Sequence, residues 1–327
     1  MSISAKDVGA LRKATGAGMM DCKEALKESG GDMDGALEFL RKKGQKIAAK
    51  RADRDTSEGV VVALTNDAGT TGVILAVGCE TDFVAKNDEF IELVNQFGKL
   101  ALEKLPATKE EFNALPFEGT TVTEKLVDTT GTTGEKLEIT DYQKVEGDNI
   151  ASYIHAGSKI GVLLSYKDGG NGEAPQFFRS VAMHIAAMAP SIMHPSEFDP
   201  EMVAKETEAV QAQIKAENEL NESENLGKPM KNVPDFVSKL QLTPEVLAAA
   251  EEKIKKQLEA EGKPEKIWDK IVPGKLERYI SDNTLLDQER CLMSQVFALD
   301  DTKTVEQAVK DFADGAEIVA YKRIAVS

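Results

Sequence analysis

Residues 72–103 read GVILAVGCETDFVAKNDEFIELVNQFGKLALE, and this stretch decides the class of fold. Its first part, 72–77, is almost continuously apolar, which is typical of a buried strand. From 87 to 103 the apolar residues recur at helical spacing instead, and Val94 and Phe97 share one face. The stretch therefore predicts a strand that is followed directly by a helix.

The predicted strand has a partner just before it in the chain. Residues 60–64 are Val-Val-Val-Ala-Leu, and residues 66–69 carry a turn signature, so the two apolar runs predict a β-hairpin. The order of strand and then helix recurs over 160–189. Both strands begin Gly-Val-(Ile/Leu)-Leu, at Gly72 and at Gly161. We expect an α+β fold whose core contains two related α+β subdomains.

The amino-terminal part of the chain predicts three short helices over residues 4–50. Ser4 and Asp32 are suitable caps for the first and third helices, and Gly16-Ala17-Gly18 separates the first from the second. We therefore assign residues 1–55 to an N-terminal three-helix domain, which is small enough to have only a thin core.

The remainder of the chain predicts three further parts. Core subdomains are assigned to 56–197, within which the Thr- and Gly-rich residues 117–147 predict strand and turn. Residues 198–272 are highly charged and helical in pattern, and we expect an inserted antiparallel coiled-coil arm. Its two apolar stripes are Val203, Val210 and Ile214, and Leu247, Ile254 and Leu258. Residues 273–327 should return to the core and end in a helix and a strand.

Composition limits the class of protein. The chain has 327 residues, 41% of them hydrophobic, which is enough for two or three packed domains. No apolar run approaches the roughly 20 residues that cross a bilayer, and the first residues lack the apolar stretch of a signal peptide. We therefore expect a cytoplasmic protein. The three cysteines form no CxxC motif, and neither they nor the three histidines predict a metal site.

Net charge argues against general binding to nucleic acid. The whole chain carries −16, yet residues 1–54 hold 12 Lys/Arg against 8 Asp/Glu, a net of +4. The rest must then carry −20. A basic head on an acidic body predicts two different surfaces, although each single charge is also accounted for by a solvated helical face.

Two kinds of catalytic or nucleotide site can be weighed. Cys79 follows a strand and would need His155 or His184 as its base, but no local pattern supports either pair, and a buried structural cysteine is the simpler interpretation. The glycines of residues 169–172 lack the Lys-Ser/Thr of a phosphate-binding loop and indicate a turn. We expect no enzyme activity, no metal and no cofactor.

The loop over residues 81–87, Thr-Asp-Phe-Val-Ala-Lys-Asn, is the remaining candidate. It lies between a strand end and a helix start, where loops often present functional groups. A purely structural interpretation is also open: Asp82 or Asn87 caps the helix, and Phe83 packs inward.

Two long motifs shift this balance, because both resemble signatures of the elongation factor Ts family. They are Thr15-Gly16-Ala17-Gly18-Met19-Met20-Asp21-Cys22-Lys23-Glu24-Ala25-Leu26 and Cys79-Glu80-Thr81-Asp82-Phe83-Val84-Ala85-Lys86. Shorter similarities follow at 152–155, 160–163, 184–187, 261–267 and 302–305. The resemblance covers nearly the whole chain.

The resemblance implies a guanine-nucleotide exchange factor that promotes GDP release from elongation factor Tu during translation elongation. It also implies a ubiquitin-associated-like three-helix head, a core of two related subdomains and a coiled-coil arm inserted in the second. These expectations agree with the division of the chain drawn from its patterns.

By the same resemblance, the segment Thr81, Asp82, Phe83 and Val84 acts as a wedge. Phe83 would insert its ring into the partner's GTPase domain, and Asp82 would engage the same region without ligating Mg²⁺. The elements that hold Mg²⁺ and the phosphates would be displaced. Further partner contacts are implied for Gly16, Gly18, Met19, Met20 and Lys23 in the head, and for His155 in the core.

Two departures from the family pattern and one alternative function remain. Residues 217–261 exceed the arm of typical members, and the chain ends at Ser327, where typical relatives continue into a helix that touches the partner. The arm could pair with a second copy of the chain or touch the partner. The alternative function is an adaptor that binds its partner without changing the bound nucleotide.

Overall fold

The computed structural model describes residues 3–155, 157–224 and 227–326. The chain forms two compact units. The first consists of Met1–Ala186 together with Gly315–Ser327, and the second of Ala187–Asp314. The expected α+β class is confirmed, since the first unit combines helices with sheets whose strands are all antiparallel.

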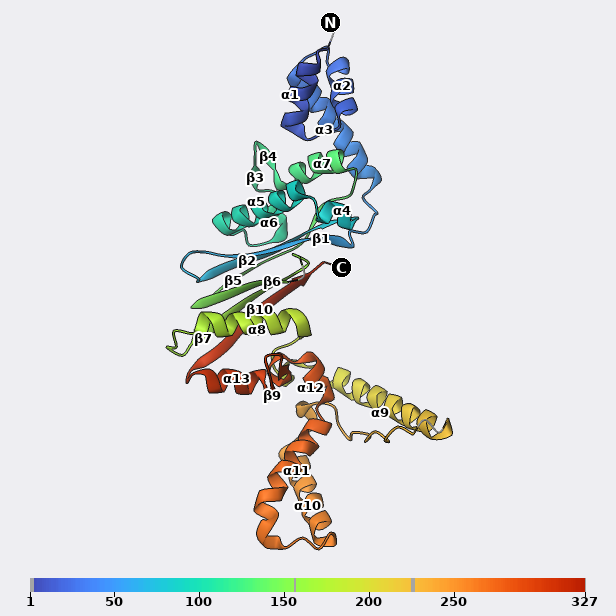
Figure 1. Ribbon diagram of the computed structural model, residues 1–327, viewed down its shortest axis with the longest axis vertical. Coiled ribbons are helices and arrows are strands. Elements are labelled where there is room, and N and C mark those ends of the chain that lie inside the picture. The colour runs from blue at the N-terminus through green and yellow to red at the C-terminus, as the bar shows by residue number, and fades with distance from the viewer. Residues whose placement is uncertain (1–2, 156, 225–226, 327) are drawn as a thin grey trace. The chain divides into compact units, whose positions relative to one another are not determined.

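The first unit contains most of the strands (Figure 1). Its elements are α1 (Ala5–Thr15), α2 (Met19–Glu28), α3 (Met33–Lys50), β1 (Glu58–Thr65), β2 (Thr71–Cys79), α4 (Asp82–Ala85), α5 (Asp88–Lys104), α6 (Lys109–Asn113), β3 (Pro116–Phe117), β4 (Thr120–Thr121), α7 (Val122–Thr133), β5 (Glu138–Glu146), β6 (Asn149–His155), β7 (Ile160–Asp168), α8 (Ala174–Met188) and β10 (Ala316–Ala325).

Two three-stranded antiparallel sheets repeat one topology. The first has the order β1-β2-β5 and the second β10-β7-β6. In each, a hairpin leads from an edge strand to the central strand, a helix follows, and a later strand returns along the other edge. Figure 1 shows α5 over the outer face of the first sheet and α8 over that of the second. The predicted internal duplication is therefore confirmed at the level of topology.

The inner faces of the two sheets pack against each other. Val61 and Ile74 from the first sheet share a buried cluster with Leu163 and Ile324 from the second. Burial of these side chains favours the layered arrangement, because apolar surface of both sheets is removed from water at once. The unit thus has four layers: helix, sheet, sheet and helix.

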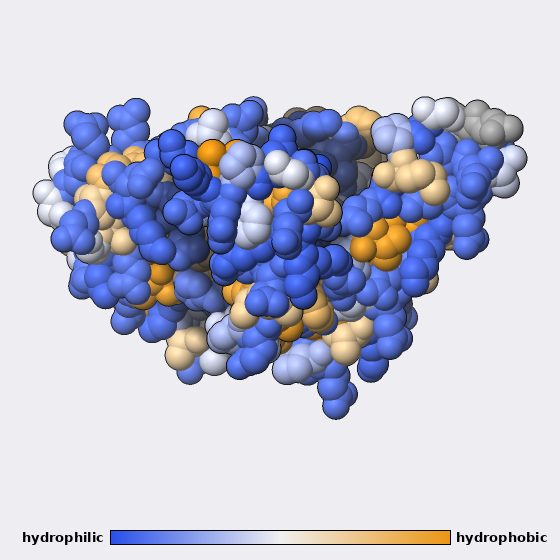
Figure 2. Space-filling model, turned by 90° about the horizontal axis from the view of Figure 1, so that it is seen from below, coloured by the Kyte–Doolittle hydropathy of each residue, from blue (hydrophilic) through white to orange (hydrophobic). Residues whose placement is uncertain are grey.

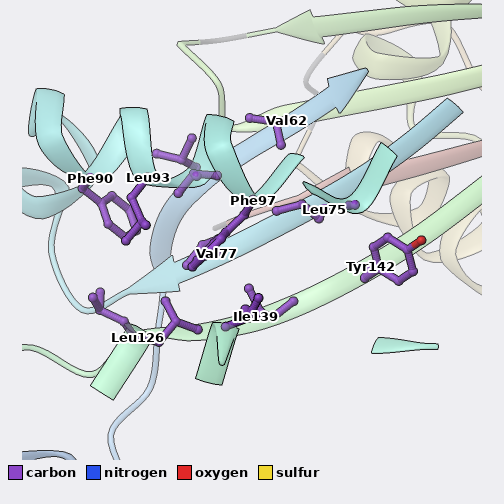
Figure 3. Close-up of a cluster of buried hydrophobic side chains, with 14 of the residues drawn as sticks. Val62, Leu75, Val77, Phe90, Leu93, Phe97, Leu126, Ile139 and Tyr142 are labelled. Atoms are coloured by element: carbon purple, nitrogen blue, oxygen red, sulfur yellow. The ribbon is translucent and has the colours of Figure 1, made fainter. Parts of the chain in front are cut away.

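A second cluster lies under α5 and fixes where β2 ends. Phe97 is fully buried and makes edge contacts with Phe112, at 6.1 Å between ring centroids, and with Phe117, at 5.0 Å. Figure 3 shows Phe97 pointing from α5 towards Val77 of β2. The same cluster includes Ala85 of α4, so the residues that follow β2 are tied to this core.

The three predicted N-terminal helices are present, with the predicted caps. Ser4 and Asp7 form a capping box on α1, and the Asp32 side chain accepts from the Gly35 amide at the start of α3. α3 also packs closely on α7 of the core. A Cβ placed on Gly131 would lie 2.9 Å from Gly44 Cα, so only glycine permits this approach of the two helices.

One sequence-based expectation for this unit is wrong in part, although β5 (Glu138–Glu146) confirms the rest of it. Residues 117–147 were predicted as strand and turn, yet Val122–Thr133 forms the helix α7, which begins with a capping box between Thr121 and Glu124. Val122, Leu126 and Thr130 are buried at helical spacing. Packing of this face outweighs the strand preference of the many threonines.

The second unit is mainly helical. Its elements are η1 (Pro195–Glu197), α9 (Pro200–Ser223), η2 (Lys239–Gln241), α10 (Pro244–Ala260), η3 (Glu265–Ile267), α11 (Trp268–Asp282), α12 (Leu285–Arg290), η4 (Leu292–Ser294), β8 (Val296–Phe297), β9 (Asp300–Thr304) and α13 (Val305–Phe312). Thr243 caps α10 by accepting from the Val246 amide, and Thr304 forms a capping box with Gln307 at the start of α13.

The expected pairing of the two apolar stripes is wrong. Val203 on α9 packs with Phe198, Val237 and Cys291, whereas Ile254 and Leu258 on α10 pack with Val272 on α11. Figure 1 shows α10 and α11 as a hairpin, with α9 directed elsewhere. The two stripes have the same spacing but pack against different elements. Spacing alone does not identify the element against which a stripe packs. α11 also continues through Pro273, across the boundary that the sequence suggested at 272/273.

An extended segment lies along α9. Asn218 and Asn221 each exchange two hydrogen bonds with one backbone residue, Lys231 and Lys228 respectively. The Gln211 side chain donates to the carbonyl of Pro234, at 3.0 Å. Residues 227–235, here called the strap, are thus held by a row of side-chain amides in place of a neighbouring strand.

Among the described helices, none combines the length and the apolar composition that a bilayer crossing requires. The face in Figure 2 is largely hydrophilic, and its hydrophobic patches are small and scattered.

Candidate functional site

The loop after β2 presents one large apolar side chain to solvent. Thr81 precedes the single turn α4, and within that turn Phe83 is 83% exposed while Ala85 is buried and Val84 partly buried against the core. The structural interpretation in which Phe83 packs inward is therefore wrong. Asn87 caps α5, accepting from the amides of Glu89 and Phe90.

Asp82 lies beside Phe83 and is paired within its own turn. Its carboxylate accepts from Lys86 Nζ at 2.7 Å. This hydrogen bond and the positive charge of Lys86 lower the pKa of Asp82. The carboxylate stays ionised at neutral pH, and a partner of Asp82 would have to compete with Lys86.

Two glutamates hold the base of this loop, in an arrangement that we call the clasp. Glu135 accepts from the amides of Glu80 and Thr81, at 3.1 and 3.0 Å, and from Thr81 Oγ1 at 2.6 Å. In return, the Glu80 carboxylate accepts from the amide of Lys136 at 2.7 Å, and from Arg51 Nη1 at 2.7 Å. These bonds lower the pKa of Glu80, the Lys136 amide contributing most.

Cys79 lies at the end of β2 and is fully buried. Burial, with a contribution from the charge of Glu135, raises the pKa of its thiol to about 12. A thiol in this state is almost entirely protonated at neutral pH, so it is a poor nucleophile. His184 is buried in α8, and His155 is exposed at the end of β6, where one ring nitrogen lies 2.9 Å from the Tyr153 hydroxyl.

The head presents its own apolar surface. Gly16 ends α1 in the left-handed conformation, at φ 70°, and Gly18 begins α2. Met19 and Met20 are 59% and 72% exposed. Both line a hollow of about 800 Å³ together with Lys23 and residues of α1.

A neighbouring hollow joins the head to the loop. It also measures about 800 Å³ and is lined by Gly16, Phe83 and Val84, among others. Lys13, Gly16 and Glu89 line both hollows. Residues from two motifs more than 60 positions apart therefore lie along one continuous surface, which we call the head–loop surface.

His155 approaches the same end of the unit through a different element. The turn after β6 carries Lys159, whose Nζ lies 2.7 Å from Glu58 of β1, and Glu58 pairs with Cys79 in the sheet. The positive charge of Lys159 also contributes to lowering the pKa of Asp82. The structure thus brings the β6 end near the loop, while His155 lines neither of the two hollows.

The sequence did not point to Glu135 or Arg51 as parts of this site, whereas Lys86 belongs to the candidate loop. No pattern connects Glu135 with Glu80, which are 55 positions apart. Only the spacing of Asp82 and Lys86, one helical turn, carried a signal. Among the described residues, no group of three or more His, Cys, Asp or Glu side chains could hold a metal ion.

Comparison with known proteins gives one consistent result. A family model described as "Elongation factor TS" matches residues 80–233 and 230–327. The chain is 69% identical over 326 residues to a protein of Rhodopirellula baltica named "Elongation factor Ts", covering 100% of this chain and 99% of that relative. Proteins of the same name from Flavobacterium johnsoniae and Sulfurovum sp. are 47% and 44% identical, covering 99% and 98% of this chain and 98% and 93% of the relatives.

Proposed function

The chain belongs to the elongation factor Ts family, and on that basis we propose that it is a guanine-nucleotide exchange factor for elongation factor Tu. In this proposal it binds elongation factor Tu that carries GDP and promotes release of the nucleotide during translation elongation. It does so through binding alone, without covalent chemistry.

The exposure of Phe83 is the structural observation that best supports this proposal. A phenylalanine that is 83% exposed forgoes about 1.5–3 kcal/mol of burial. It lies in a turn whose neighbours Ala85 and Val84 are packed against the core, so the ring is presented from a fixed base. An exposed, well-positioned aromatic side chain is the kind of residue that dominates protein–protein binding energy.

Exchange requires differential binding. A GTPase holds GDP through a phosphate-binding loop and Mg²⁺, and an exchange factor must bind the empty form more tightly than the GDP form. We propose that Thr81, Asp82, Phe83 and Val84 form the wedge. Phe83 enters a pocket of the partner's GTPase domain, and Asp82 engages the adjacent region without acting as a Mg²⁺ ligand.

The head–loop surface extends this contact. Gly16, Gly18, Met19, Met20 and Lys23 are proposed to dock on the GTPase domain, with the methionines adapting to an apolar surface. The excess of basic residues in 1–54 favours an acidic patch on the partner and raises the association rate. His155, exposed at the end of β6, is proposed to touch another part of the partner.

The finer architecture is part of the same proposal. It comprises a ubiquitin-associated-like head over residues 1–55, core subdomains over 56–197, and a coiled-coil arm that continues past the predicted boundary at 272/273 to the end of α11, with the chain back in the first unit from Gly315. In the arm, α10 and α11 supply the antiparallel helix pair. Self-association through the arm, and the absence of contacts with nucleic acid or membranes, belong to the proposal too.

Release of fluorescent GDP from elongation factor Tu tests the function directly. Catalytic amounts of the protein should accelerate release, whereas an adaptor would bind and leave the rate unchanged. Phe83→Ala should lower the catalysed rate by about 10- to 100-fold, since each 1.4 kcal/mol is a factor of ten. Leu299→Ala is a matched control, because Leu299 is also exposed, at 62%, but lies in the second unit. Equal loss in both variants, or in neither, would refute the assignment of Phe83.

A further inference from the structure

The geometry points to Glu135 as the positioning residue of the wedge: by clasping Glu80 and Thr81 it fixes the direction in which Phe83 projects. This inference rests on the proposed exchange function. Glu135 belongs to neither of the two family motifs, residues 15–26 and 79–86, and it would act on the partner only through the loop.

Glu135 accepts three hydrogen bonds at the start of the loop. The amides of Glu80 and Thr81 are consecutive, and both donate to Glu135 Oε2, while Thr81 Oγ1 donates to Oε1 at 2.6 Å. Hydrogen bonds to a carboxylate are roughly twice as strong as neutral ones. Two consecutive peptide planes and one side chain are thereby fixed immediately before Asp82.

The clasp is reciprocal, and this makes it stiff. The Glu80 carboxylate binds the amide of Lys136 and both of its oxygens lie 2.7 Å from Arg51 Nη1. Each of the two segments thus holds the backbone of the other through a carboxylate. Arg51 follows α3 directly, so the head's last helix is tied to the same point.

Beyond Phe83 the loop is held by apolar contacts instead. Val84 and Ala85 pack into the cluster under α5, and Asn87 caps that helix. The ring therefore lies between a charged anchor on one side and a buried anchor on the other. Removal of the charged anchor leaves the buried one in place, so the loop should loosen without loss of the fold.

A wedge works only if it yields less than the site that it enters. If residues 80–82 can bend, part of the binding free energy deforms the loop and is not available to displace the partner's nucleotide-holding elements. Met19 and Met20 lie in the head, outside the clasp, and keep their exposed surface when Glu135 is changed. We therefore expect a lower maximal rate of release at an almost unchanged half-saturating concentration.

The variants Glu135→Ala and Glu135→Gln, compared with Glu124→Ala, test the inference in the fluorescent-GDP release assay. Glu135→Ala should lower the maximal rate by about tenfold, with the half-saturating concentration within about twofold of wild type. Glu135→Gln keeps an acceptor oxygen for the two amides and should restore most of the rate. Glu135 follows the end of α7, whereas Glu124 belongs to the capping box at the start of that helix, away from the loop. Glu124→Ala should therefore match wild type.

A double-mutant cycle with Phe83→Ala separates positioning from general support of the fold. If Glu135 acts through Phe83, Glu135→Ala should have little further effect once Phe83 is already alanine. Additive losses would overturn the inference, as would a wild-type maximal rate for Glu135→Ala. Failure of the proposed function looks different, because wild-type protein would then leave GDP release unchanged. Should Glu135→Ala not fold, Thr81→Val, which removes the 2.6 Å bond alone, carries the same cycle.

Discussion

Gly161 of β7 lies directly against Val61 of β1, across the interface of the two sheets. A Cβ placed on Gly161 would be 2.7 Å from Val61 Cγ1 and 3.0 Å from Ile74 Cδ1. Gly72, the equivalent residue of the first sheet, lies against Leu163 in the same way, with a hypothetical Cβ at 3.0 Å from Cδ2. The first residue of each Gly-Val-(Ile/Leu)-Leu run therefore faces the third residue of the other run, which is what an internal twofold relationship requires.

Gly161→Ala should consequently destabilise the first unit. Overpacking of a core by one methyl group costs about 1–3 kcal/mol, and both neighbours belong to buried strands that cannot move aside. Thermal or denaturant unfolding measures the change. Gly172→Ala, at a position with no atom within 4 Å and no positive φ, should stay within about 0.5 kcal/mol of wild type. Equal stability of the two variants would contradict the packing described here.

Sequence patterns predicted most elements of this core, because each element is specified by residues that are close together in the chain. The hairpin of β1 and β2, the caps at Ser4 and Asp32, and the order of strand then helix each depend on residues close in sequence. The helix α7 was missed because its buried face is interrupted by threonines, whose own preference is for strands. The partners of α9 and α10 were missed because equal spacing does not identify a partner.

For the candidate site, the sequence located the loop but not what holds it. Phe83 was singled out from its motif, and the structure shows that it is exposed. The clasp could not be foreseen, since Glu135 reaches Thr81 over 54 positions and Arg51 reaches Glu80 over 29. Contacts of this kind depend on tertiary packing. In the sequence alone, isolated glutamates and arginines look like ordinary surface charges.

Cys79 should be chemically inert in the folded protein. With its pKa raised to about 12, the thiolate fraction at about pH 8 is lower by roughly three powers of ten than that of an ordinary cysteine, and the side chain is also buried. Alkylation followed by mass spectrometry of the Cys79 peptide should show slow modification until the protein is unfolded. Cys79→Ala should keep GDP release within about twofold of wild type. Rapid alkylation of the native protein would show that the thiol is accessible and ionised.

Asp287 should make the stability of the second unit depend on pH. Its side chain is fully buried, and burial raises the pKa of the carboxyl, although the amide of Lys239 donates to it at 2.7 Å. The folded state then binds this proton more tightly than the unfolded state. The resulting stability is fully present below the carboxyl's ordinary pKa and is lost as pH rises through the raised value.

The variant Asp287→Asn removes that titration. We expect its melting temperature to exceed that of wild type increasingly as pH rises from about 4 to about 7, because asparagine carries no charge to bury. Calorimetry across this pH range measures the difference. Asp301→Asn, at an exposed position of the same unit, should follow the wild-type curve throughout. If the melting-temperature difference between Asp287→Asn and wild type instead became smaller as pH rises, the pH dependence would have the opposite sign and this explanation would be excluded.

The strap along α9 gives the last prediction, since it is held mainly by side-chain amides. Asn218 accepts from and donates to Lys231 at 2.8 Å in both directions, and Lys231 Nζ also pairs with Glu217 at 2.5 Å. Asn218→Ala removes two hydrogen bonds of about 1 kcal/mol each, so opening of the strap should become roughly 5- to 30-fold more frequent.

Hydrogen exchange at the Lys231 amide reports this opening directly, because that amide donates to Asn218 Oδ1. Glu208→Ala is the matched control, because Glu208 is an exposed residue of the same helix. Exchange at Lys231 should accelerate in Asn218→Ala alone. Since α9 keeps its buried contacts through Val203, protection within the helix should persist while the strap opens. Equal acceleration in both segments would mean that strap and helix open as one cooperative element.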